Sequence, residues 1–453
     1  MKTINPATGK VIKEYSEMSF EEVSGIIYRA NIAQKQWKHK SFTNRSVNLN
    51  KIAKSLKENK QELGELMSTE MGKPLSQSIG EIEKCAWVCE YYAENAEDFL
   101  SDDSVETDAS KSYVTFNPLG TVLSIMPWNF PFWQLFRFAA PALMAGNAVI
   151  LSHSENVTGC ALEIEKIIHT SGIPADLFRT ILVQNENMKP VIQHNGIAAV
   201  TLTGSTRAGK IVASQAGEAL KKTVLELGGS DPSIILADAD LKQAAESCVN
   251  SRILNSGQSC IAAKRFLVVE EVYDEFVSEF KKLMESKKVG DPFDEATDIG
   301  PMAREDLRDG LHEQVQKSIE AGANCILGGE KPGALGSFYP VTILENVTKG
   351  MPAYDEELFG PVASIIKVQD EEEAIKVAND SIYGLGASIY SKDVEKAEKI
   401  AAEQLEAGCC FVNDFVKSDP RLPFGGIKQS GYGRELGLYG IREFVNTKTV
   451  YVK

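Results

Sequence analysis

The sequence has few of the residues that build cross-linked or metal-centred folds. It contains only 8 cysteines and 5 histidines among 453 residues. So sparse a set of cysteines excludes a disulfide scaffold, and no Cys/His cluster with zinc-binding spacing accompanies them. No apolar run is long enough to span a bilayer, and the amino terminus lacks the basic and apolar segments of a signal peptide. We therefore expect a cytoplasmic protein that holds no metal ion.

An excess of positive charge is also missing. Lys and Arg number 48 against 63 Asp and Glu, which gives a formal net charge of −15. Because such a surface repels phosphate backbones and anionic lipids, we expect neither a nucleic-acid partner nor a membrane partner. Hydrophobic residues make up 43% of the chain and charged residues 25%, as in ordinary globular proteins. The length exceeds what one core can serve, so two large domains are expected.

The first hundred residues are predicted to be mainly helical. Apolar residues at helical spacing predict helices over 20–37, 44–58 and 61–99, with a break in the last at Gly72-Lys-Pro74. A polar, acidic loop then leads into a short strand over 112–116. This strand precedes the main alternating pattern, and we expect it to pair outside the main sheet.

From Gly120 onward, short apolar runs alternate with helical stretches. Strands are predicted over 121–126, 148–151, 179–183 and 198–203, and a second alternating region begins after Gly229. Such alternation is typical of βαβ units and parallel sheets, whose ligands gather at the carboxyl ends of the strands. The chain closes on a β-prone segment over 443–452. Left alone it would be an exposed edge, so we expect another subunit to cover it.

Three features at strand ends or bends carry candidate chemistry. Cys260 follows Gly257 on a bend, where a thiol can face a cleft, although a single cysteine is more often a small core residue. Glu226 stands between apolar residues before a Gly-Gly break, as a paired core ion or as a base of raised pKa. The segment from Gly204 to Gly209 is a strand-to-helix turn that suits a pyrophosphate, or an ordinary turn.

Six motifs in register resemble the NAD(P)-dependent aldehyde dehydrogenase superfamily. They are Pro127-Trp-Asn-Phe-Pro131, Gly204-Ser-Thr206, Glu226-Leu-Gly-Gly229, Gly257-Gln-Ser-Cys260, Glu357-Leu-Phe-Gly-Pro361 and Pro423-Phe-Gly-Gly-Ile-Lys428. The segments 418–424 and 260–266 are most similar to the compact bacterial and archaeal succinate-semialdehyde dehydrogenases. The resemblance covers nearly the whole chain.

The resemblance implies an α/β fold of two parallel-sheet domains, a Rossmann-like cofactor domain and a catalytic domain, with a small β oligomerisation arm. The implied boundaries are 1–97 and 117–228 for the NAD(P)-binding domain, 229–430 for the catalytic domain, and 98–116 with 431–453 for the arm. A homodimer or homotetramer is expected.

The resemblance also implies a mechanism. The thiolate of Cys260 attacks an aldehyde, while the Asn129 side chain and the backbone N–H of Cys260 hold the oxyanion. Hydride leaves to the nicotinamide, and Glu226 activates the water that hydrolyses the thioester. Relatives that pass the acyl group to coenzyme A generally lack this glutamate, so its presence favours hydrolysis. The cofactor contacts implied by the resemblance are Trp128, Ser152, Glu155, Gly204, Ser205, Glu357 and Phe359.

One of these positions departs from the family pattern. Ser152 stands where the family usually has Lys, and Glu155 offers a carboxylate that accepts from a ribose 2′-hydroxyl and repels a 2′-phosphate. We therefore predict that NAD is preferred, with NADP as the alternative.

Three residues are expected to contact the substrate. Trp133 and Arg137 follow Asn129 at i+4 and i+8, so a helix beginning at Phe130 would place all three near one face. Arg137 then pairs with a distal carboxylate, or with an acidic neighbour between helices. Ser418 is a second carboxylate donor. The prediction is oxidation of succinate semialdehyde or a close carboxylated aldehyde.

Other functions remain open at this point. They are oxidation of an uncharged aldehyde such as lactaldehyde, a catalytically silent binding protein of this fold, and cofactor-free ester hydrolysis as a side activity of Cys260. Five cysteines are expected in the core, namely Cys85, Cys89, Cys160, Cys248 and Cys325. Cys409 or Cys410 is a weakly supported disulfide partner for Cys260.

Overall fold

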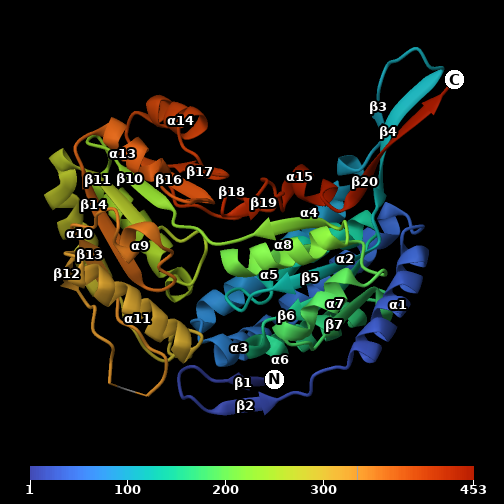
Figure 1. Cartoon of the computed structure of the whole chain (residues 1–453), viewed down its shortest axis with the longest axis horizontal. Helices are drawn as coiled ribbons and strands as arrows, with labels where there is room; N and C mark the ends of the chain where they lie inside the picture. Colours follow the sequence, from blue (N-terminus) through green and yellow to red (C-terminus); the bar gives the residue numbers. More distant parts are fainter. Residues whose placement is uncertain (334) are drawn as a thin grey trace.

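The chain forms two α/β lobes and a projecting arm in the computed structural model, which describes residues 1–333 and 335–453 (Figure 1). Four helices precede the main sheets, and their bounds agree with the sequence pattern within two residues. They are α1 (Phe20–Trp37), α2 (Phe42–Glu58), α3 (Lys60–Met71) and α4 (Leu75–Phe99). The predicted break falls at Gly72, whose φ of 82° ends α3 in the left-handed conformation.

The first lobe is built on a six-stranded sheet of order β19-β9-β8-β5-β6-β7. All neighbouring pairs are parallel except β19 with β9, as the βαβ pattern predicts. The strands are β5 (Thr121–Met126), β6 (Ala148–His153), β7 (Phe178–Ile181), β8 (Ala199–Thr203), β9 (Lys222–Glu226) and β19 (Gly431–Tyr432). The connecting helices are α5 (Trp133–Ala145), α6 (Thr158–Thr170), α7 (Met188–Gln193) and α8 (Thr206–Glu218), with short 3-10 turns η1 (Glu155–Val157), η2 (Ala175–Leu177) and η3 (Asn185–Asn187).

The second lobe contains a seven-stranded sheet of order β12-β13-β14-β11-β10-β16-β17, in which only β12 is antiparallel to its neighbour. Its strands are β10 (Pro232–Ile235), β11 (Arg265–Val269), β12 (Asn324–Leu327), β13 (Thr342–Glu345), β14 (Val362–Val368), β16 (Gly386–Tyr390) and β17 (Cys409–Val412). Its helical elements are α9 (Leu241–Ile253), η4 (Leu254–Gly257), η5 (Glu270–Val272), α10 (Tyr273–Glu285), α11 (Glu305–Glu320), α12 (Pro352–Asp355), α13 (Glu371–Asn379) and α14 (Val394–Glu403).

Alternate residues along the strands of this second sheet face two separate cores. Ile235 and Phe266 pack with residues of α9 and α10, whereas the adjacent Ile234 and Leu267 pack with residues of α11, α13 and α14. This is the two-residue period of a strand buried on both faces. The sheet is therefore held rigidly between two helical layers.

A three-stranded antiparallel sheet of order β20-β4-β3 stands away from the body at the C-terminal end (Figure 1). It joins β3 (Asp103–Ser104) and β4 (Lys111–Pro118) to β20 (Val445–Val452), so the strand expected over 112–116 does pair outside the main sheets. The segment just before β20 belongs to the first lobe. Its strand β19 extends the sheet of that lobe, and its helix α15 (Gly437–Arg442) lies against α4 and α5.

Two small antiparallel pairs complete the fold. They are β1 (Lys2–Ile4) with β2 (Val11–Glu14), and β15 (Tyr383–Gly384) with β18 (Ile427–Lys428). Among the described residues, no helix is both long enough and apolar enough to cross a bilayer.

Candidate active site

The loop that carries Cys260 adopts a backbone conformation that few residues allow. After α9, the φ angles of Asn255, Ser256 and Gly257 are 53°, 56° and 75°, all in the left-handed region. A Cβ atom at Gly257 would lie 2.3 Å from the carbonyl oxygen of Gly360, so a side chain does not fit there. Arg252 fixes the bend by donating from Nη2 to the Gly257 carbonyl oxygen at 2.6 Å. The bend expected from the sequence is thus a rigid structure.

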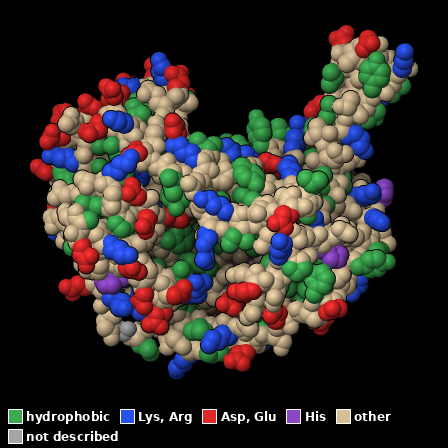
Figure 2. All heavy atoms as spheres, in the orientation of Figure 1, with side chains coloured by type: hydrophobic (Ala, Val, Ile, Leu, Met, Phe, Trp, Pro, Cys, Tyr) green, Lys and Arg blue, Asp and Glu red, His purple; other side chains and the backbone are tan. Residues whose placement is uncertain are grey.

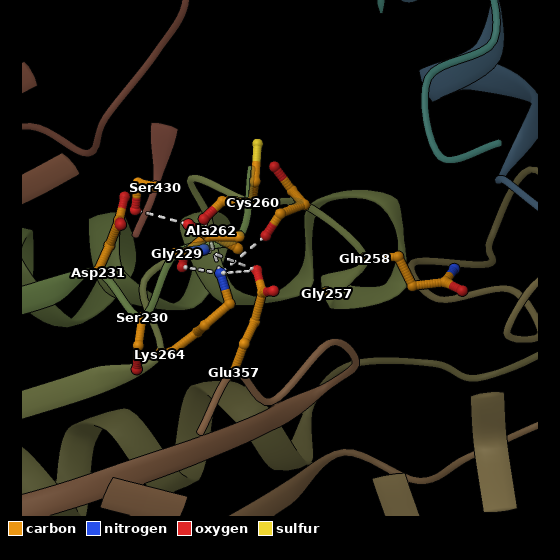
Figure 3. A network of polar contacts seen from close by, with 12 residues as sticks. Gly229, Ser230, Asp231, Gly257, Gln258, Cys260, Ala262, Lys264, Glu357 and Ser430 are labelled. Carbon is orange, nitrogen blue, oxygen red and sulfur yellow. Dashed lines mark hydrogen bonds and ion pairs between the residues drawn. The ribbon is translucent and has the colours of Figure 1, made fainter. Parts of the chain in front are cut away.

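The buried side chain of Lys264 holds this loop through hydrogen bonds to its backbone. Lys264 Nζ donates to the carbonyl oxygens of Ser259, Cys260 and Ala262 at 2.9, 2.8 and 3.2 Å. Figure 3 shows these contacts converging on Nζ, while the sulfur of Cys260 points away from them. Lys264 also lies 3.6 Å from Glu357 Oε1, which compensates its charge. The loop therefore curls around one cation and presents its thiol on the opposite side.

The surroundings of Cys260 favour the neutral thiol over the thiolate. Burial raises its pKa to about 12, although the positive charges of Arg137 and Lys264 act in the opposite direction. Attack on a carbonyl requires the thiolate, so the site must supply a proton acceptor or further positive charge.

Asn129 lies beside the nucleophile loop. The side-chain Nδ2 of Asn129 donates to the backbone carbonyl oxygen of Gln258 at 3.1 Å. The backbone carbonyl oxygen of Asn129 accepts from Asn255 Nδ2 at 2.6 Å. An amide nitrogen carries two N–H groups, so one remains for a developing oxyanion. Asn129 precedes the helix: α5 begins at Trp133, and the expected start at Phe130 is wrong. The shared helical face proposed for Asn129, Trp133 and Arg137 does not exist for Asn129.

Glu226 ends strand β9 with its carboxylate fully enclosed. Neither carboxylate oxygen has a hydrogen-bond partner among the described residues, and the residue is 2% exposed. Burial, followed by the negative charge of Glu435, raises the pKa of Glu226 well above its usual value. Arg137 lowers the pKa values of both Glu226 and Cys260, so the base and the nucleophile lie within the field of one guanidinium.

The sequence did not reveal Glu435, which is the acidic partner of Arg137. The Arg137 Nε forms a buried ion pair with Glu435 Oε2, and Nη2 donates to Thr203 Oγ1 at 3.4 Å. The guanidinium also lies over the Phe424 ring, 4.6 Å from its centre. Arg137 thus has an acidic neighbour, which was the alternative to a substrate contact.

A cavity of about 290 Å³ reaches Cys260. Trp133, Arg137 and Ser418, the three residues expected to contact substrate, all line it together with Cys260. Lys84 on α4 also lines it, and no motif in the sequence indicated this. Its Nζ donates to Ser418 Oγ at 2.9 Å, and Trp133 Nε1 donates to the same oxygen at 3.0 Å.

Two of the residues expected to contact a cofactor lie at the start of α8. Gly204 and Ser205 connect β8 to this helix, and the exposed Ser205 caps it by accepting from the Ala208 N–H at 3.2 Å. The rings of Trp128 and Phe359 meet edge to face with centres 5.7 Å apart. Glu357 accepts from the Gly229 N–H at 3.0 Å and keeps 19% of its side chain exposed.

The position that departs from the family pattern, Ser152, lies near the end of β6. Ser152 is buried within the strand, whereas Glu155 is exposed and has no ion-pair partner among the residues described. All eight cysteines are free. Cys85, Cys89, Cys160 and Cys248 are buried as expected, but Cys325 is partly exposed. Within the described part of the chain, no group of three or more His, Cys, Asp or Glu could hold a metal ion.

The chain belongs to the aldehyde dehydrogenase family, whose model matches residues 1–450. It is 48% identical over 450 residues to a probable succinate-semialdehyde dehydrogenase [NADP(+)] of Synechocystis sp., covering 99% of both chains. It is 43% identical over 449 residues to the succinate semialdehyde dehydrogenase [NAD(P)+] Sad of Escherichia coli, covering 99% of this chain and 97% of that one.

A solved structure agrees with these matches. The succinic semialdehyde dehydrogenase of Streptococcus pyogenes, in complex with NADP+, superposes with a TM-score of 0.97 at 37% identity, covering 100% of this chain and 99% of that one. The predicted fold class and the predicted oxidation of an aldehyde are therefore confirmed.

Proposed function

We propose that this enzyme oxidises succinate semialdehyde, or a closely related carboxylated aldehyde, to the carboxylic acid. The observation that carries the proposal is the cavity that reaches Cys260 and is also lined by hydroxyl and cationic side chains, among them Ser418 and Arg137. Relatives that are 43–48% identical over nearly their whole length bear that activity in their names.

The chain's own residues account for the steps on the substrate. The Cys260 thiol gives up its proton to water, and its sulfur then bonds to the aldehyde carbon. The second Nδ2 proton of Asn129 stabilises the oxyanion. When bound, a nicotinamide would supply the acceptor for the hydride that this adduct loses on becoming a thioester. Glu226 then removes a proton from water, whose oxygen displaces the Cys260 sulfur and releases the acid.

The residues expected to contact the cofactor have the chemistry that a dinucleotide requires. The exposed start of a 13-residue helix supplies N–H groups suited to a pyrophosphate, and two half-buried aromatic rings offer an apolar contact for a flat ring system. The partly exposed carboxylate of Glu357 can accept from ribose hydroxyls. These contacts support assigning Trp128, Gly204, Ser205, Glu357 and Phe359 to cofactor binding.

We further propose that NAD is preferred over NADP. The exposed carboxylate of Glu155 repels a 2′-phosphate, and the buried Ser152 provides no cation to attract one. The names of the relatives state NADP(+) or NAD(P)+, so the proposal depends on these two positions alone. Measuring kcat/KM with each cofactor tests it, and a clear NADP preference would refute it. The Glu155→Ser variant should shift the ratio of kcat/KM values toward NADP.

An uncharged aldehyde is the competing substrate class, and one observation favours it. Arg137 is already compensated by Glu435, and much of the cavity wall is apolar, including Phe130, Ile261, Phe415 and Phe424. The deciding experiment is an aldehyde panel with succinate semialdehyde, butanal and lactaldehyde, followed by NADH absorbance at saturating cofactor. Cys260→Ser serves as the inactive control. A kcat/KM for butanal equal to that for succinate semialdehyde would contradict the proposal.

We also propose that the arm joins two or more copies of the chain. β20 is an outer strand of the three-stranded sheet, and most of its residues are exposed, including Tyr451 and Val452. Figure 2 shows this arm projecting from the body with apolar side chains on its surface. The open edge of a strand of this length is normally covered. Light scattering should give a dimer or tetramer mass, and a monomer at micromolar concentration would refute this.

A further inference from the structure

Lys84 is a cation in the substrate cavity that lacks a paired carboxylate. The other two cations lining the cavity are compensated, Arg137 by Glu435 and Lys417 by Asp414 at 2.6 Å. Among the described residues, no carboxylate lies within ion-pairing distance of Lys84 Nζ. Its contacts are the Ser418 hydroxyl and the Trp133 ring, 4.1 Å from Nζ to the ring centre.

The hydrogen bonds around Ser418 leave donors unused. Its Oγ accepts from both Lys84 and Trp133, so the hydroxyl proton is available for a third partner. An ammonium has three N–H groups, and Ser418 engages one of those on Lys84. Unused donors and an uncompensated cation in a largely apolar cavity are costly, and both are relieved when an anion binds.

We propose that Lys84 and Ser418 form the receptor for the distal carboxylate of the substrate, in the cavity that has Cys260 in its wall. This inference rests on the proposed function, because it requires a carboxylated aldehyde. It adds Lys84 to the recognition of the substrate charge, because the charge of Arg137 is already shared with two buried glutamates. A carboxylate here would receive one hydrogen bond from the ammonium and one from the Ser418 hydroxyl.

The charge on Lys84 changes within an accessible pH range. Burial lowers its pKa to about 8, and the nearby guanidinium of Arg137 on α5 acts in the same direction. Three acidic groups raise the pKa of Lys84, namely Glu81 and Cys85 on the same helix, α4, and Asp419, which follows Ser418 in the chain. Lys84 is therefore mostly charged at pH 7 and mostly neutral at pH 10. Since kcat/KM reports the free enzyme, recognition of a carboxylate should weaken over this interval.

The first test compares succinate semialdehyde with butanal, which lacks the carboxylate, at saturating cofactor. The Lys84→Met variant keeps the length and apolar stem of the side chain but removes its charge. A charge-assisted hydrogen bond of ordinary strength predicts that the ratio of the two kcat/KM values falls about 10- to 150-fold. The lower kcat/KM for succinate semialdehyde should come from a higher KM for this substrate. A ratio that stays within threefold of wild type would overturn the proposal.

A matched control comes from the same cavity. Lys417→Met removes an equal charge from a lysine that is already paired with Asp414, and should change the ratio less than threefold. An equally large loss in Lys417→Met would mean that general cavity charge, rather than Lys84, selects the substrate.

The wild-type enzyme provides a test that does not depend on a variant folding. Between pH 7 and 10 the same kcat/KM ratio should fall as Lys84 loses its proton, because effects of Cys260 and Glu226 are common to both aldehydes and cancel. A flat ratio would refute the proposal. If wild type shows no preference for succinate semialdehyde at pH 7, the proposed function itself has failed. A preference that survives in Lys84→Met removes only the role of Lys84.

Discussion

Replacing Arg137 with Met removes the cation that pairs with Glu435 in a buried group that contains two glutamates. Arg137, Glu435 and Glu226 are 2%, 3% and 2% exposed, so their charges are shielded little by water. Breaking a buried ion pair by removing one partner typically costs about 3–5 kcal/mol in the free energy of unfolding. Arg137→Met should reach this range, because it breaks the buried ion pair with Glu435 and leaves Glu226 with only the weaker influence of Arg434.

The converse substitution should cost less. Glu435→Gln leaves one guanidinium and one carboxylate, since Arg137 also acts on Glu226. The double variant, Arg137→Met with Glu435→Gln, removes both members of the ion pair and should recover part of the loss. The measurement is the urea midpoint of each variant by tryptophan fluorescence and circular dichroism, combined as a double-mutant cycle. A cost below about 1 kcal/mol for Arg137→Met would refute the reasoning.

The pH dependence of stability provides a second test of the Arg137→Met variant. Burial raises the pKa values of Glu226 and Glu435 above their unfolded values, so the folded state binds more protons than the unfolded state. Stability from such groups is fully present below the unfolded pKa and is lost as pH rises through the folded pKa. Without Arg137 the folded values rise further. The deficit of Arg137→Met should therefore be larger at pH 8 than at pH 5, and the opposite order would contradict the charge assignment.

Two further predictions concern the catalytic loop and the base. The Glu226→Gln variant should release about one equivalent of NADH per site in a burst and then turn over about 10²–10⁴-fold more slowly than wild type, because hydrolysis loses its base. Rapid quench with absorbance measures the burst and the later rate. An unchanged steady-state rate would remove Glu226 from hydrolysis. Gly257→Ala should cost about 1–3 kcal/mol of strain and most of the activity, since its φ is 75° and its Cβ meets the Gly360 carbonyl oxygen at 2.3 Å. Gly217→Ala in α8, where nothing lies within 4 Å, is the control and should be neutral or slightly stabilising. Equal effects at both glycines would contradict the loop argument.

Much of the fold could be predicted because its signals are local. The helix α1 matches its predicted bounds, and a capping box begins it: Ser19 Oγ accepts from the Glu22 N–H at 3.2 Å, and Glu22 accepts from the Ser19 N–H at 2.7 Å. Strand β5 also matches its predicted bounds. The start of α5 was misplaced because Asn129 and Phe130 are held in a turn, where Asn129 bonds to residues over a hundred positions away, beyond the reach of periodicity.

The amino-acid sequence by itself determined the alternation of strands and helices, the position of the nucleophile bend and the motifs that place the chain in its family. These follow from neighbouring residues, whose spacing and backbone preferences act over a few positions. Only the tertiary structure decided which charges meet. Arg137 pairs with Glu435, and Lys84 reaches Ser418 across 334 positions of sequence. Such contacts depend on how the lobes and the C-terminal segments pack, and local pattern carries no record of that packing.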